Sequence, residues 1–180
     1  MNLTLKGMIR LHPYHHPLFC KFIVYFNCNQ DYFECHEVLE EYWKSITPCT
    51  KEHPLTGFIQ LSTSLYHWRR ENFSGAYRTM VKAEQKLSRL SQYDNRYTEE
   101  IDVNHLLEHI HSSLKKIENA GTFSPFVIKV TSSNLSTLLQ TTVDGMQLLP
   151  MNSDAVIHKH MLRNRSDILA EREKKKGRPR

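Results

Sequence analysis

The segment best equipped for chemistry is Tyr32–Trp43, where an imidazole and several carboxylates interrupt an apolar pattern. An α-helix turns about 100° per residue, so His36 and Glu40 fall in the same sector as Phe33. A purely structural helix would carry Leu or Ala at positions 36 and 40. A buried carboxylate without a partner is costly or takes up a proton. Something must therefore compensate His36 and Glu40.

A second segment, residues 54–71, is expected to supply that compensation. One line along it is polar and small, and its members are Gly57, Gln60, Ser64 and His67. The small residues would let another helix come close. If the two helices pack antiparallel, the acids and imidazole of the first face Gln60 and His67 of the second.

These donor types predict a metal site within a helical bundle. Imidazole and carboxylate are the ligands that zinc, iron and manganese use. We expect His36, Glu40 and His67 to be the ligands of such a divalent metal, with Glu37 as a general base acting on bound water. The order H-E-x-x-E differs from the H-E-x-x-H of zinc proteases, so the pattern does not indicate a protease.

The same side chains fit a second interpretation. They could form a buried network of hydrogen bonds and ion pairs that fixes how two helices pack, with Arg69 or Arg70 neutralising a carboxylate. The sequence leaves both interpretations open. Converging donors around one point would favour a site, whereas fully paired donors and acceptors would favour the network.

Helical periodicity and capping residues predict an all-α fold, a compact bundle of about five helices. Asp31, Asn72 and Asp102 are expected as N-caps, and Gly121 is expected to end the last helix in a left-handed conformation. The expected helices cover residues 18–27, 32–45, 54–71, 72–90 and 102–117.

The chain divides into three parts by composition. Residues 1–16 form an N-terminal segment, 17–121 the bundle and 122–180 a less regular C-terminal extension. Within the extension, residues 132–142 are rich in Ser and Thr, and helix-compatible sequence returns only near Ser153. We expect this extension to wrap the bundle and to end in a basic helix and a disordered tail.

The motifs together resemble a known bacterial family, the domain of unknown function 309. The resemblance rests on Tyr32–Trp43, on Gly57–Leu61, on Tyr66–Arg70, and on Asn72 with Gly75-Ala76. It implies a small all-α fold, a cytoplasmic protein and a description as a predicted metal-dependent hydrolase acting on an unidentified small molecule. It also adds Glu34 and Gln60 as supporting residues beside Glu37 and the ligands.

Charge is unevenly distributed along the chain. Residues 158–180 carry nine basic and three acidic side chains, so the rest of the chain is close to neutral although the whole carries +5. The end resembles the Gly-Arg-Pro core of the minor-groove AT-hook, with Lys176, Arg178 and Arg180 as the contacts. Nucleic-acid binding by this tail is one alternative function. A noncatalytic interaction protein is another, and a solubilising charged end is the commoner use of such a tail.

Other features favour a protein of the cytoplasm. No apolar run is long enough for a signal peptide or a membrane span. Cys20, Cys28, Cys35 and Cys49 show no C-x-x-C pair and are expected to be reduced thiols.

Two further groups of histidines are weaker metal-site candidates. His105 and His109 stand one turn apart on the solvated side of an expected helix. His12, His15 and His16 lie in a Pro-bounded segment at the start and are weaker still.

Overall fold

The helices begin at the polar residues that the sequence marks as caps. In the computed structural model, which describes residues 11–162, the carboxylates of Asp31 and Asp102 and the side-chain oxygen of Asn72 each accept a hydrogen bond of 3.0 Å. The donor is the backbone N–H three residues further on, as in a first helical turn.

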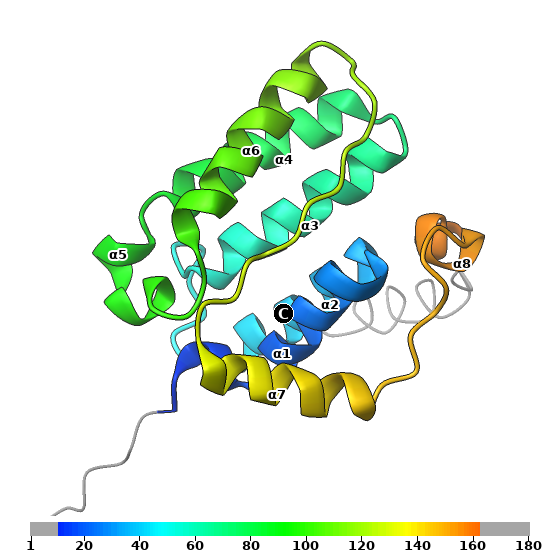
Figure 1. Ribbon diagram of the computed structural model, residues 1–180. Helices are drawn as coiled ribbons and strands as arrows, with labels where there is room; N and C mark the ends of the chain where they lie inside the picture. The colour runs from blue at the N-terminus through cyan, green and yellow to red at the C-terminus, as the bar shows by residue number, and fades with distance from the viewer. Residues whose placement is uncertain (1–10, 163–180) are drawn as a thin grey trace, which may run out of the picture.

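The predicted all-α class is confirmed. No strand forms within residues 11–162, where the only β-type pairing is an isolated bridge between Ile101 and Val130. The helices, shown in Figure 1, are α1 Pro17–Val24, α2 Tyr32–Ser45, α3 Leu55–Arg69, α4 Phe73–Leu87, α5 Leu90–Tyr93, α6 Val103–Glu118, α7 Ser133–Asp144, α8 Asp154–Ile157 and α9 Lys159–Leu162. Short 3₁₀ turns η1 Pro13–His15 and η3 Asn95–Thr98 and a π-turn η2 Tyr25–Asn29 complete the order.

Helix α3 is the centre of the bundle, packed against α4 on one side and α2 on the other. Its apolar face is fully enclosed, with Phe58, Leu61 and Leu65 at 0% exposure. The predicted small face does not meet α2. Ser64 Oγ donates to the carbonyl of Ala76 at 2.7 Å, and a Cβ on Gly57 would lie 3.0 Å from Leu87, so the close approach is to α4.

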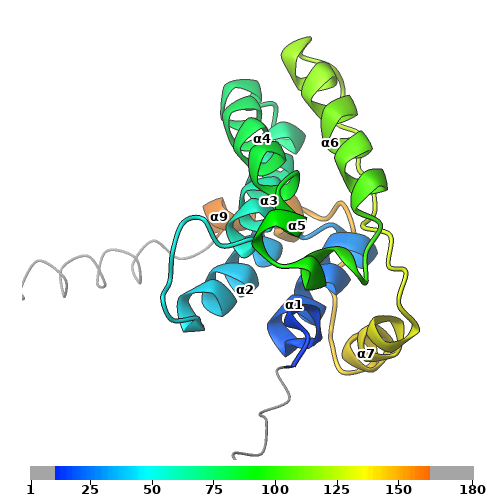
Figure 2. The ribbon, with the colours of Figure 1, turned by 90° about the vertical axis from the view of Figure 1, so that its left-hand side faces the viewer.

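Helix α7 corrects the expectation that residues 132–142 are irregular. Ser132 caps it by accepting from the N–H of Leu135 at 3.3 Å. Its Ser and Thr hydroxyls donate to the carbonyls four residues back, for example Thr137 to Ser133 at 3.0 Å, so they do not compete with the helix. Helix α7 lies beside α1 (Figure 2), where Leu135 is fully buried. Tertiary packing thus overrides a weak helix propensity.

The extended segment 122–132 runs back along the bundle between α6 and α7 (Figure 1). It is fixed at several points: Trp68 Nε1 donates to the carbonyl of Gly121 at 2.9 Å, and the side chain of Asn27 bonds both backbone groups of Ile128 at 2.9 Å. The turn before this segment differs from the prediction, because Ala120, with φ 50°, takes the left-handed conformation instead of Gly121.

The end of the described chain contains two single-turn helices. The basic helix expected after Ser153 is interrupted at His158, between α8 and α9. Its continuation beyond Leu162 and the tail residues Lys176, Arg178 and Arg180 lie outside the described residues.

The structure also shows the state of the cysteines and the length of the apolar helices. None of Cys20, Cys28, Cys35 and Cys49 forms a disulfide within the described residues. None of the helices in residues 11–162 has the length and hydrophobicity to cross a bilayer.

We predict that replacing Leu135 by Ala will lower the free energy of unfolding by about 2–4 kcal/mol, because a fully buried side chain between α7 and α1 is lost. The matched change Leu138→Ala, on the exposed side of the same helix, should cost less than about 0.5 kcal/mol. Urea unfolding monitored by circular dichroism measures both. Equal effects would mean that α7 does not pack as described.

Candidate functional site

One imidazole and two carboxylates lie close together on the surface of α2. His36, Glu37 and Glu40 each offer a ligand atom, and these atoms all lie within 4.8 Å of one another. Nδ1 of His36 lies 3.2 Å from Oε1 of Glu37, and Glu40 forms an ion pair of 3.1 Å with Lys44 one turn on. The geometry brings together three of the residues that the sequence singles out.

These side chains are less buried than the pattern predicts. Those of His36, Glu37 and Glu40 are about one-third exposed, at 33%, 35% and 35%. The face of α2 that packs into the core instead carries Tyr32, Cys35, Val38, Leu39 and Tyr42. The sector containing Phe33 and Trp43 therefore lies at the rim of the seam, where its carboxylates remain in contact with water.

A cavity of about 230 Å³ lies beside this group. Its walls come from α2, α3 and α9, with Arg70 just after α3, and they are formed by Tyr32, Phe33, His36, Thr63, Tyr66, His67, Arg70 and His160. His36 and His67 thus face one cavity from two helices, as the sequence predicts. The rings of Phe33 and Tyr66 are 5.9 Å apart, and the Arg70 guanidinium lies 5.3 Å from the Tyr66 ring centroid.

Helix α9 is held against the cavity by polar contacts. Lys159 Nζ pairs with Asp31 Oδ2 and Glu34 Oε1, both at 2.8 Å. His160 Nδ1 and the hydroxyl of Tyr66 are 2.6 Å apart. Glu34, expected as a supporting residue, therefore anchors α9. Periodicity within one helix gave no signal for Lys159 or His160, which lie more than 90 residues further along the chain.

His67 sits on the opposite wall from the group on α2 and is not one of its three members. The amide of Asn72 lies 3.1 Å from its Nδ1. Burial, together with the nearby charges of Arg70 and Arg78, lowers the pKa of His67 below the ordinary 6.5. The neutral imidazole is therefore favoured, and neutral imidazole is the form that binds metals.

Gln60 does not line the cavity. Its Oε1 is enclosed and has no hydrogen-bond partner among the described residues. Such an acceptor is unusual in a folded protein and is often satisfied by a bound water molecule. Gln60 therefore stays a predicted supporting residue without a contact to the group on α2.

A second cluster contains histidines that are weaker candidates by sequence. His12 and His15 meet Glu100, which follows His15 by 85 residues along the chain. The Pro-bounded segment of histidines was the only sequence signal, and nothing in a single sequence indicates that Glu100 joins it.

Comparison with known proteins identifies relatives. The sequence profile of the family called "Domain of unknown function (DUF309)" matches residues 19–79. The chain is 34% identical over 160 residues to "Uncharacterized protein YpuF" of Bacillus subtilis strain 168, an alignment that covers 85% of this chain and 90% of that protein. No solved structure matches the chain significantly.

We predict that the pKa of His67 in metal-free protein lies below 6.5 and that Arg70→Gln raises it toward that value, since a neighbouring positive charge is removed. Lys44→Gln, which alters a charge elsewhere at the site, should leave it unchanged. NMR titration, assigned with His67→Gln, measures the pKa.

The same shift has a consequence for stability. Because the pKa of His67 is lower in the folded chain, protons bind this residue more readily in the unfolded chain below pH 6.5. The free energy of unfolding is therefore unaffected by His67 above pH 6.5 and decreases as the pH falls below that value. His67→Gln should therefore lose less stability than the parent between pH 7 and 5. A pKa of His67 at or above 6.5 would contradict both expectations.

Proposed function

Because the chain belongs to the family of the domain of unknown function 309, we propose for it metal-dependent hydrolysis of a small molecule, with the α2 group holding the ion beside the cavity. The observation that carries the proposal is the convergence of three ligand atoms within 4.8 Å, next to a cavity of about 230 Å³ that His36 itself lines. The donor set suits zinc, iron or manganese.

The donors of α2 fit such an ion. The pairing of His36 Nδ1 with the Glu37 carboxylate favours the tautomer with the proton on Nδ1, which leaves Nε2 as the ligand nitrogen. Glu40 can leave Lys44 and bind a metal ion at little cost, since Lys44 is 62% exposed and surface ion pairs contribute little to stability. His36 and Glu40, one turn apart, would hold the ion, and the role of His67 as a third ligand stays a prediction.

When bound, a divalent ion lowers the pKa of a water molecule and polarises the bond to be hydrolysed. The chain supplies the remaining parts. Glu37 is placed to accept a proton as general base, and its carboxylate also orients His36. In the cavity, Phe33 and Tyr66 offer apolar contact, while Arg70 offers a positive charge. These walls favour a substrate with an apolar body and a carboxylate or phosphate group.

The alternative of a packing network has less support. The contacts of His36 and Glu40 run along α2, to Glu37 and Lys44, rather than across the seam to Gln60 or His67. The alternative of nucleic-acid binding by Lys176, Arg178 and Arg180 concerns residues outside the described range and gains nothing from the structure.

We predict that untagged protein purified without chelator binds a divalent metal through α2, and that His36→Gln or Glu40→Gln removes it. Glu37→Gln should keep the metal and lower the turnover of phosphate or carboxylate esters by about 10²–10⁴-fold, because only the proton acceptor is lost. His111→Gln, on the exposed side of α6, is the matched control and should change neither property. Elemental analysis and a hydrolysis screen provide the measurements. If His36→Gln and Glu40→Gln bind as much metal as the parent, the proposal is wrong.

A further inference from the structure

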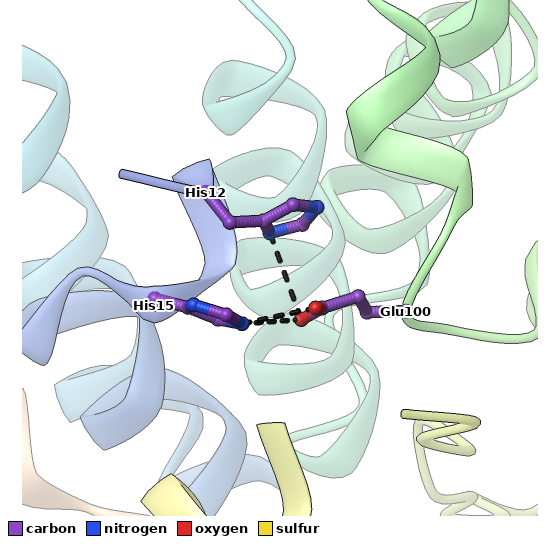
Figure 3. Close-up of side chains that lie close together, drawn as sticks. All are labelled: His12, His15 and Glu100. Atoms are coloured by element: carbon purple, nitrogen blue, oxygen red, sulfur yellow. Dashed lines mark hydrogen bonds and ion pairs between the residues drawn. The ribbon is translucent and has the colours of Figure 1, made fainter. Parts of the chain in front are cut away.

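Two histidines of the N-terminal turn converge on a carboxylate from the segment between η3 and α6. Figure 3 shows the rings of His12 and His15 directed at Glu100. Nε2 of His15 lies 2.9 and 2.8 Å from the two oxygens of Glu100, and Nδ1 of His12 lies 3.6 Å from Oε2. One ligand atom from each of the three residues falls within 4.8 Å of the others.

This cluster is much more enclosed than the group on α2. The side chains of His12, His15 and Glu100 are only 12%, 18% and 12% exposed. Exposed acidic groups gather on many protein surfaces without a ligand, but a carboxylate removed from water requires compensating charge or hydrogen bonds. The burial therefore calls for a partner to the negative charge.

The backbone holds the three residues rigidly in place. Pro13 opens the turn η1, and the buried Tyr14 between the histidines donates its hydroxyl to the carbonyl of Tyr97 at 2.6 Å. On the other side, the carbonyl of Glu100 accepts from the N–H of Thr131 at 2.9 Å, next to the bridge between Ile101 and Val130. His12 also caps this turn, since its Nδ1 accepts from the N–H of Tyr14 at 3.2 Å. The three residues are thus preorganised by the fold, as a specific ion site requires.

Charge points to a cation as the missing partner. Within residues 11–162, no Lys or Arg forms an ion pair with Glu100. Glu99 adds a second carboxylate, 3.8 Å from Nε2 of His12, and that nitrogen is enclosed without a hydrogen-bond partner in the described part of the chain.

We propose that His12, His15 and Glu100 bind a divalent transition-metal ion, preferentially zinc, at a structural site that ties the N-terminal turn to the segment before α6. Ligand atoms about 2.0–2.1 Å from a tetrahedral ion lie about 3.3 Å apart, close to the 2.8 and 3.6 Å that separate the histidine nitrogens from Oε2 of Glu100. His12 can use Nε2, which faces Glu99 and has no hydrogen-bond partner among the described residues, or Nδ1, which faces Glu100 and would first give up its bond from the N–H of Tyr14. Glu99 or water completes the coordination.

The role is structural because the ligands come from segments that meet only in the folded chain. The unfolded chain separates His15 and Glu100 by 85 residues, so an ion held by both binds the folded state almost exclusively. Its binding free energy then adds to the stability of the fold. This site is independent of the group on α2.

The test is zinc-dependent thermal stability of the untagged, full-length, metal-free protein. At a zinc concentration of about 100 times Kd, we expect the Tm to rise by about 5–10 °C. The variants His12→Gln and Glu100→Gln should show a clearly smaller rise than the parent, limited to what the group on α2 contributes. His12→Gln leaves the contact between His15 and Glu100 in place, so it stays informative even if Glu100→Gln folds poorly.

Two controls separate this site from others. His105→Gln removes a histidine from the His105–His109 pair of α6, whose Nε2 atoms are 3.2 Å apart, and should retain the full rise. His36→Gln should lose only the part of the rise that comes from the group on α2, and each of His12→Gln and His36→Gln should bind one equivalent of zinc fewer than the parent. A Tm rise in His12→Gln and Glu100→Gln equal to that of the parent, or no rise in the parent, would overturn the proposal.

Discussion

The rest of the structure depends on the close contact between α3 and α4. Ser64 and Gly57 bring the two backbones together, with a hydroxyl of α3 bonded directly to a carbonyl of α4 at 2.7 Å. Because this contact uses the small face of α3, α2 packs on another side of the same helix. The cavity beside His36 and His67 lies between α2 and α3.

Helix positions could be predicted from the sequence because they depend on local chemistry. Asp31, Asn72 and Asp102 cap their helices through bonds to residues three positions on, and this spacing is visible in any single sequence. Helix α7 escaped prediction because its Ser and Thr residues have weak helix propensity, and what stabilises it is the burial of Leu135 against α1. That contact cannot be seen from residues 132–144 alone.

The sequence predicts which residues lie at the candidate site, but it does not predict how buried they are. His36 and His67 do face one cavity, yet periodicity placed the sector of Phe33 and Trp43 in the core, whereas α2 is rotated so that Tyr32 and Leu39 are buried instead. Both sectors of α2 contain apolar residues, so only the partner helices decide between them. Contacts across the chain, such as Lys159 with Asp31 and Glu34, leave no periodic signal at all.

The contrast between the two His/Glu groups follows from where their donors come from. His36, Glu37 and Glu40 lie within five residues on one helix and stay about one-third exposed, so an ion there would remain open to water and substrate. His12, His15 and Glu100 are joined only by the fold and are nearly enclosed, so an ion there would exchange little and reinforce the fold. Accessible coordination suits catalysis and enclosed coordination suits structure. One small helical chain can therefore hold a catalytic and a structural ion at different places. Loss of a ligand from the enclosed cluster would weaken the fold and leave the donors of α2 in place.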